Sequence, residues 1–195
     1  MEIKIMNESD FSTSVWAGGK TTEMYLYPEG SSYKERNFLF RISSATVEKE
    51  TSVFTKLDGI HREIVLLRGN MVLQHRQEAP VTIAPYKPYA FEGSWETVSQ
   101  GCAQDFNLMY QNCRGSIHVI TGNGSALFEK IAGMDFFYSP EEDFQINQQL
   151  IKRGQLAMIT GQRDKVKIDT KSDNPGVIHV SVNIKGEDDS VTTGF

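Results

Sequence analysis

The chain has 195 residues, enough for one large domain or two small modules with a hydrophobic core that needs no disulfides. Its 25 acidic and 20 basic residues give a formal net charge of -5. This mild acidity argues against a nucleic-acid-binding protein, which presents a basic surface to phosphates, and against binding to an anionic membrane. With 39% hydrophobic and 23% charged residues, the composition is typical of a soluble globular protein.

The sequence predicts no targeting or membrane-spanning segment. Met1–Glu8 lacks a cationic region followed by an apolar run, and no apolar stretch approaches the length that crosses a bilayer. We therefore expect a cytoplasmic protein. Cys102 and Cys113 are too irregularly spaced for a zinc module, and in the cytoplasm we expect both to be reduced thiols.

Short segments with a two-residue hydrophobic period follow one another along the first half of the chain and predict strands. These segments are Thr22–Tyr27, Phe38–Val47, Glu63–Leu67, Met71–His75, Val81–Ile83, Ala90–Glu92 and Asp105–Tyr110. The turn residues 68–70, between the third and the fourth segment, predict that these two form a hairpin.

The same rhythm continues in the second half. Strands are predicted at Ile117–Ile120, Asp135–Tyr138, Leu156–Ile159, Val166–Ile168 and Val177–Val182. Only Ala126–Ala132 is equally compatible with a short helix. The whole pattern predicts an all-β fold, either a sandwich or a barrel. No proline- or serine-rich linker interrupts residues 111–116, so we expect the two halves to pack closely.

One charged residue lies inside an otherwise apolar strand segment. Alternation places Arg41 and Ser43 on one face of Phe38–Val47, with Phe40 and Ile42 on the other. A buried arginine requires a partner. Two interpretations remain open, a structural ion pair and a binding group for an anionic ligand.

Two further strands also carry a polar face. Alternation groups Asp105 with Asn107 and Met109, and Thr21 with Glu23 and Tyr25. If these strands line one barrel, then Glu23, Arg41, Asp105 and Asn107 converge at its mouth, where small barrels hold ligands.

Patterns of metal binding and nucleophilic catalysis are missing from the sequence. His61, His75, His118 and His179 are scattered, with no pair at the spacing that brings two imidazoles to one metal. No Gly-x-Ser-x-Gly motif occurs, and the residues 18–21 do not form a phosphate loop because a strand follows them. We therefore predict no metal and no cofactor.

Four blocks carry a family resemblance: Trp16–Glu23, Phe38–Ala45, Phe54–Arg62 and Asp105–Met109. In this order they resemble the HutD/Ves family of cupin-like proteins, which is associated with histidine utilisation. The resemblance implies a bicupin, with two cupin-like jelly-roll β-barrel modules in one chain. The first module, residues 1–112, would carry the ligand pocket, and the second, residues 113–195, would pack tightly on it. The usual cupin metal set, a His-x-His with a later carboxylate and histidine, is absent.

Carried over position by position, the resemblance also implies a site. Its ligand-binding residues would be Thr21, Glu23, Arg41, Arg62, Asp105 and Asn107, supported by packing of Trp16 and Phe106. The implied function is metal-free binding of a small anionic metabolite of histidine breakdown, such as N-formylglutamate or urocanate, to tune the pathway. In this hypothesis Arg41 binds a carboxylate through two hydrogen bonds, while Asp105 and Asn107 orient a polar group.

Two alternatives to that function stay open. The first is an isomerase or hydrolase that acts on a small acid, with Glu23 or Asp105 as general base. The second is a purely structural ion-pair network in a protein that works through partner contacts. By analogy with other cupins, which pair through sheet edges, we also expect a homodimer.

Overall fold

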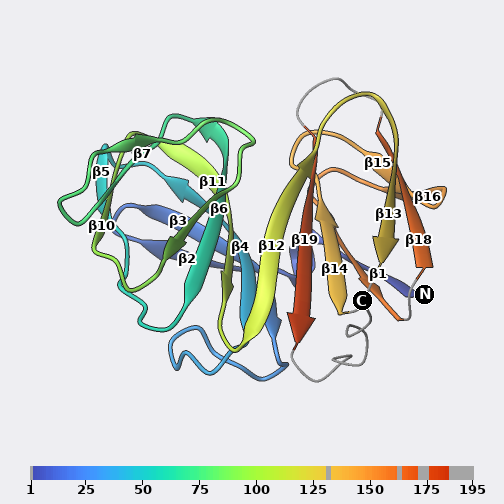
Figure 1. Cartoon of the computed structure of the whole chain (residues 1–195), viewed down its shortest axis with the longest axis horizontal. Coiled ribbons are helices and arrows are strands. Elements are labelled where there is room, and N and C mark those ends of the chain that lie inside the picture. Colours follow the sequence, from blue (N-terminus) through green and yellow to red (C-terminus); the bar gives the residue numbers. More distant parts are fainter. Residues whose placement is uncertain (1, 131–132, 162–163, 171–175, 185–195) are drawn as a thin grey trace, which may run out of the picture. The chain divides into compact units, whose positions relative to one another are not determined.

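The computed structural model describes residues 2–130, 133–161, 164–170 and 176–184 (Figure 1). Strands make up nearly all of its regular structure, so the all-β class is confirmed. The chain divides into two compact units, which we call the pocket unit, residues 9–111, and the second unit, formed by residues 1–8 and 112–195. Among the described residues, no helix is long and apolar enough to cross a membrane.

The pocket unit contains two antiparallel sheets. The larger sheet has the order β2-β3-β4-β11-β6-β9, and its strands are Ser12–Trp16, Gly19–Tyr27, Phe40–Val47, Ala103–Tyr110, His61–Gly69 and Tyr89–Glu92. The smaller sheet has the order β5-β10-β7-β8, with strands Thr51–Val53, Thr97–Gln100, Val72–His75 and Val81–Thr82. Buried side chains from both sheets, among them Ile64, Leu66 and Leu73, form one core cluster. The unit is therefore a two-sheet sandwich.

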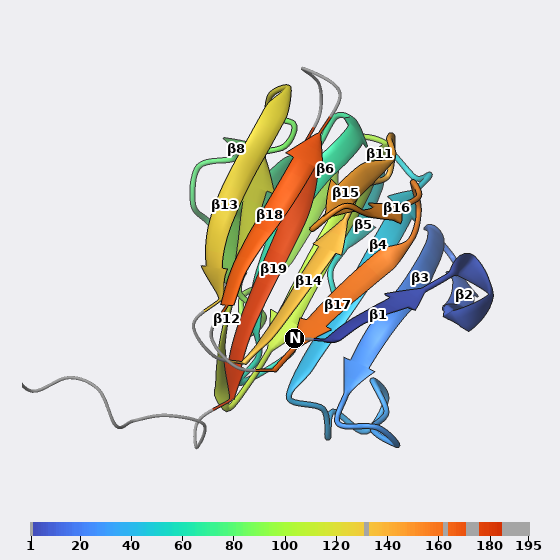
Figure 2. The ribbon, with the colours of Figure 1, turned by 90° about the vertical axis from the view of Figure 1, so that its right-hand side faces the viewer.

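The second unit repeats this plan with other strands. Its larger sheet has the order β1-β17-β14-β19-β12, with strands Glu2–Met6, Leu156–Thr160, Met134–Tyr138, Val177–Ile184 and Cys113–Ile120. Its smaller sheet has the order β13-β18-β15-β16, with strands Gly124–Lys130, Asp164–Thr170, Phe144–Ile146 and Gln149–Ile151. Phe137, Ile146 and Ile168 belong to the cluster of buried residues that joins the two sheets. Figure 2 shows β1 beside β17 at the edge of the larger sheet.

The first residues of the chain do not follow the module boundary expected from the sequence. Strand β1 pairs with β17, so residues 2–6 extend a sheet of the second unit instead of opening the first. The short 3-10 turn Glu8–Asp10 then leads to β2 in the pocket unit. Because the partner strand lies about 150 residues away in the sequence, local pattern does not reveal this pairing.

The prediction of a hairpin around residues 68–70 is wrong. Strand β6 pairs with β11 and β9 in the larger sheet, whereas β7 pairs with β10 and β8 in the smaller one. The turn therefore carries the chain from one sheet to the other. Gly69 has a φ of 83°, and a Cβ there would overlap the carbonyl oxygen of Cys102, so the residue suits this close crossing.

The segment Ala126–Ala132, which was also compatible with a short helix, lies in a strand over its described residues 126–130. Residues 124–130 form β13, which pairs with β18, and residues 131–132 lie outside the described part of the chain. Leu127 is exposed while Phe128 packs against the core, the alternation of a strand with one buried face.

Candidate functional site

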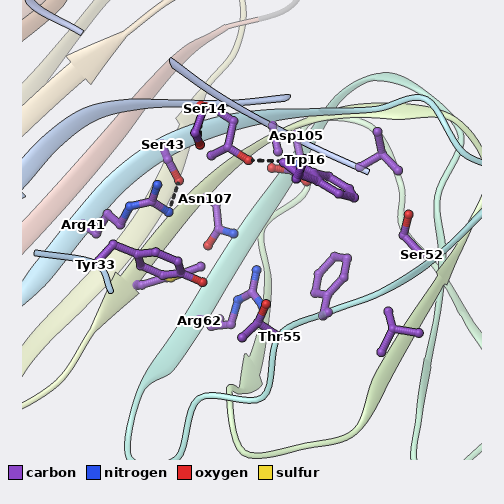
Figure 3. Close-up of a pocket in the computed structure, with 16 residues that line it drawn as sticks. Ser14, Trp16, Tyr33, Arg41, Ser43, Ser52, Thr55, Arg62, Asp105 and Asn107 are labelled. Carbon is purple, nitrogen blue, oxygen red and sulfur yellow. Dashed lines mark hydrogen bonds between the residues drawn. The ribbon is translucent and has the colours of Figure 1, made fainter. Parts of the chain in front are cut away.

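A cavity of about 300 Å³ lies within the pocket unit (Figure 3). Side chains from the larger sheet form one wall, and residues 52–55, which include part of β5, contribute from the other. Its polar and aromatic lining consists of Ser14, Trp16, Thr21, Tyr33, Arg41, Ser43, Ser52, Phe54, Thr55, Arg62, Asp105 and Asn107. A cavity of this size between two sheets can hold a small metabolite.

The pairing of β4 with β11 explains why polar groups gather there. Asp105 lies opposite Ala45, and Asn107 lies opposite Ser43, so both strands turn the same face toward the cavity. The intervening side chains, such as Phe106, are fully buried on the opposite face. The faces predicted for these two strands are confirmed, and Phe106 supports the site only from behind the sheet.

In β3, only the first part has the side-chain orientation that alternation predicts. Thr21 lines the cavity, and Glu23 lies opposite Ser43. An irregularity after Glu23 then shifts the register, so that Tyr25 lies opposite Ile42 and stacks on Phe40. A bulge inserts one residue and reverses the alternation. The expectation that Tyr25 shares the face of Glu23 is therefore wrong.

Arg41 is held by three neighbours. Its Nε donates a hydrogen bond to Oε2 of Glu23 at 2.7 Å, and its Nη1 donates to Oγ of Ser43 at 3.3 Å. The guanidinium carbon lies 4.3 Å from the ring centre of Tyr33. Only 6% of Arg41 is exposed. Its charge is compensated by Glu23, which pairs with Arg41 and does not itself line the cavity.

Arg62 is equally buried, but the Nε atom of its guanidinium has no hydrogen-bond partner among the described residues. Its carbon Cζ lies 4.7 Å from the ring centre of Phe54 and 5.1 Å from that of Phe91, and its Nε is buried and unpaired. Burial lowers the pKa of Arg62 to about 10, while the charge of Asp105 acts in the opposite direction. Arg62 therefore stays positively charged at neutral pH and has donors free for a ligand.

Asp105 and Asn107 provide acceptors in the same cavity. They are 2% and 5% exposed, and the Oδ1 atom of each is buried without a hydrogen-bond partner among the described residues. Burial raises the pKa of Asp105 to about 6, although the charge of Arg62 and a backbone hydrogen bond from Ala45 oppose this shift. A buried acceptor left unpaired costs about 1–3 kcal/mol, so such groups are expected to meet a ligand.

Residues 8–177 match the family model HutD. The chain belongs to the HutD family. The solved structure of HutD from Pseudomonas fluorescens SBW25 in a formate condition superposes with a TM-score of 0.81 at 20% identity, and the match covers 95% of this chain and 100% of that one. A conserved protein of unknown function from Pseudomonas aeruginosa PAO1 gives a TM-score of 0.80 at 20% identity, covering 94% and 100%. No curated protein matches the chain as a relative.

More distant structures place this HutD-family protein among cupin-like folds. The bacterial pirin YhhW from Escherichia coli, solved in complex with nickel(II), has a TM-score of 0.64 at 7% identity, covering 94% of this chain and 99% of its own. An oxalate decarboxylase mutant from Bacillus subtilis has a TM-score of 0.58 at 7% identity, covering 92% and 76%. At these identities the likeness concerns the fold alone.

Trp16 lies at the rim of the HutD-family cavity. Its indole Nε1 donates to Oγ1 of Thr21 at 3.2 Å, and the residue is 40% exposed. A Cβ at Gly18 would overlap the Trp16 ring, and one at Gly19 would overlap the carbonyl oxygen of Thr46. The glycine pair thus serves close packing at the cavity rim.

Sequence reasoning missed two aromatic residues of the cavity. Tyr33 belongs to a loop that shows no periodic pattern, and its position over Arg41 depends on the tertiary structure. Phe54 begins one of the blocks that carry the family resemblance, which was the one available signal for it. Together they give the two guanidinium groups aromatic contacts that also exclude water.

His61 and His75 belong to the pocket unit, whereas His118 and His179 lie side by side in the second unit, with ring centres 6.0 Å apart. His61 bonds to Glu92 at 2.8 Å, His75 to Thr97 at 2.9 Å, and His179 to Asp135 at 2.8 Å. In the described ranges of the chain, no group of three or more His, Cys, Asp and Glu side chains could hold a metal ion.

Proposed function

We propose that this HutD-family protein binds a small carboxylate in the cavity of its pocket unit, without a metal, as an accessory protein of histidine utilisation. One observation carries the proposal. Two buried guanidinium groups, Arg41 and Arg62, line the same cavity together with Asp105 and Asn107. Buried arginines that line a cavity are the usual protein solution for recognising a carboxylate.

The two arginines have different tasks in this proposal. Arg41 already uses Nε and Nη1 for Glu23 and Ser43, so it offers a ligand only its remaining donors. The Nε of Arg62 has no hydrogen-bond partner among the described residues, so Arg62 provides the main carboxylate contact in this proposal. Glu23 fixes Arg41 and balances its charge.

The size and polarity of the cavity restrict the ligand. A volume of about 300 Å³ suits a small metabolite, and the oxygen atoms of Asp105 and Asn107 suit a ligand that also carries an N–H or O–H group. N-formylglutamate and urocanate, the acids suggested by the family resemblance, have both a carboxylate and an N–H. They are therefore the first ligands to test.

Thermal denaturation in the presence of these acids tests the proposal. A ligand at about 100 times its Kd should stabilise the protein by about 2.7 kcal/mol. We expect Arg62→Met to abolish this stabilisation while circular dichroism shows an intact fold. Arg114→Met, an exposed arginine of the second unit, is the matched control and should bind as the wild type does. A stabilisation that survives Arg62→Met unchanged would contradict the assigned contact.

A second candidate function is proton transfer on the bound acid, with Asp105 as general base. Asp105 lines the cavity, whereas Glu23 is bonded to Arg41 and does not. A raised pKa of about 6 also suits a base that operates near neutral pH. Turnover of a bound acid that is lost in Asp105→Asn and kept in Glu23→Gln would support catalysis.

A further inference from the structure

The ionised cavity has no spare positive charge. Glu23 balances Arg41 at 2.7 Å, and Asp105 is the acid whose charge acts on Arg62. The charged and titratable groups that line the cavity together with Asp105 are Arg62 on β6, Arg41 on β4 and Tyr33 from the loop before β4. The two arginines are the charged members of this set.

A carboxylate that enters such a cavity meets Asp105 as a like charge. It must share Arg62 with Asp105, and both anions lie where water is largely excluded, since Asp105 is 2% exposed. Repulsion between like charges is strong in such surroundings and favours the neutral form of one partner. Asp105 is the partner that the protein already holds in an unfavourable setting, with one oxygen buried and unpaired.

We propose that the cavity binds a carboxylate together with one proton, which Asp105 takes up from solvent as the ligand enters. This inference rests on the proposed function and deepens it. Protonation removes the like charge, leaves Arg62 to the ligand and turns Asp105 into a hydrogen-bond donor toward it. With a single ligand carboxylate in the cavity, the bound state is then electrically balanced, as the empty one is.

The electrostatics of the free protein agree with this role. Burial raises the pKa of Asp105 to about 6, and Arg62 is the largest influence that keeps it from rising further. A ligand that engages Arg62 weakens that influence. Asp105 therefore binds its proton more tightly in the complex than in the free protein, and ligand affinity must fall as the pH rises above about 6.

Calorimetric titration with N-formylglutamate measures this linkage directly, because both of its carboxylates remain ionised above pH 6. Between pH 7 and 8.5 we expect the Kd to rise by up to about tenfold per pH unit. At pH 8 the binding heat should differ between Tris and triethanolamine buffers, by the amount that corresponds to uptake of about one proton. Formate is the second probe and should show the same pH dependence at higher concentration.

Two isosteric variants assign the proton to its residue. In Asp105→Asn the pH dependence and the proton uptake should both disappear, and at pH 8 binding should be at least as tight as in the wild type. In Glu23→Gln the pH dependence should persist, whatever the affinity, because Glu23 faces Arg41 and not the cavity. Proton uptake that persists in Asp105→Asn would overturn the proposal.

The outcomes separate this inference from the function on which it rests. Binding of N-formylglutamate with the same Kd from pH 7 to 8.5, and without proton uptake, would overturn the inference and leave carboxylate binding intact. Failure of both N-formylglutamate and formate to bind at any pH from 5.5 to 8.5 would instead overturn both proposals.

Discussion

Both units consist of two antiparallel sheets, but their buried polar groups lie in different surroundings. In the pocket unit, Arg62, Asp105 and Asn107 line a cavity, and each has a buried polar atom without a hydrogen-bond partner among the described residues. In the second unit, the buried acid Asp135 is bonded to His179 at 2.8 Å, and the ring of His179 stacks on Phe137 at 4.6 Å.

Within the same architecture, buried polar groups thus lie in two different surroundings, a cavity and an apolar core. The Asp135–His179 pair of the second unit shares one hydrogen bond, and its histidine ring packs on Phe137. Nδ1 of His179 is also buried without a partner among the described residues, but the pair does not line the cavity. The polar groups of the pocket unit are incompletely satisfied, and the protein maintains them at a cost in stability. Unpaired polar groups that line a cavity are the observation that supports the carboxylate binding proposed above.

The largest expected effect is on the apolar packing of the second unit. Phe137 is 1% exposed and contacts both Phe128 and His179. Phe137→Ala should therefore lower the free energy of unfolding by about 3–5 kcal/mol, because it opens a cavity in a packed core. Denaturant unfolding measures the loss, and hydrogen exchange should locate it at β14 and β19. A loss below 1 kcal/mol would mean that this core is not tightly packed.

Replacing the buried acids Asp105 and Asp135 by asparagine should change the free energy of unfolding in opposite directions. The folded pKa of Asp105 lies above its unfolded value of 3.8, so its contribution to stability is complete below about pH 4 and is lost as the pH rises through about 6. Asp105→Asn should therefore stabilise the unliganded protein at pH 8 by about 2–3 kcal/mol, and at pH 3.5 by little. Thermal denaturation at both pH values measures the effect.

Asp135→Asn is the matched variant in the second unit. It weakens the bond to His179, and a loss of about 1–2 kcal/mol at pH 8 is expected because a charge-assisted hydrogen bond becomes a neutral one. If both variants changed stability in the same direction, the contrast between the cavity acid Asp105 and the hydrogen-bonded acid Asp135 would fail.

A smaller effect is expected at the cavity rim. Gly18→Ala places a methyl group against the ring of Trp16, which must then move away from Thr21. Because Trp16 is 40% exposed, the loss of stability should stay near 1 kcal/mol. Tryptophan fluorescence should shift to longer wavelength. Gly30→Ala strains an exposed loop at a φ of 83° but meets no neighbouring atom, so it should leave the spectrum unchanged.

Period-two alternation was the strongest predictor of the site. It assigned Arg41 and Ser43 to one face of β4, and Asp105 and Asn107 to one face of β11, and the structure places all four at the cavity. Arg62 entered only through the family resemblance, because the sequence around it shows no polar face. Its position depends on the pairing of β6 with β11, which places it opposite Met109.

Features that depend on irregular backbone or distant partners were not predictable. The bulge in β3 reverses the alternation at Tyr25, and no residue type marks its position in the sequence. The chain crosses between sheets after Gly69, although the turn residues there are those of a hairpin. A turn sequence specifies a local bend but does not determine which strand will pair next. The pairing of β1 with β17 brings residues 2–6 beside residues 156–160, which are far apart in the sequence.

By itself, the sequence determined the all-β class and the polar and apolar faces of the regular strands. Through its family blocks it also indicated five residues that line the cavity: Thr21, Arg41, Arg62, Asp105 and Asn107. These properties follow from side-chain order along one strand, which alternation makes readable. Only the tertiary structure decided that Glu23 neutralises Arg41 while Arg62 keeps its donors free, and that Asp105 is buried beside it. Charge balance and desolvation depend on which strands become neighbours, and contacts between strands distant in sequence set that arrangement.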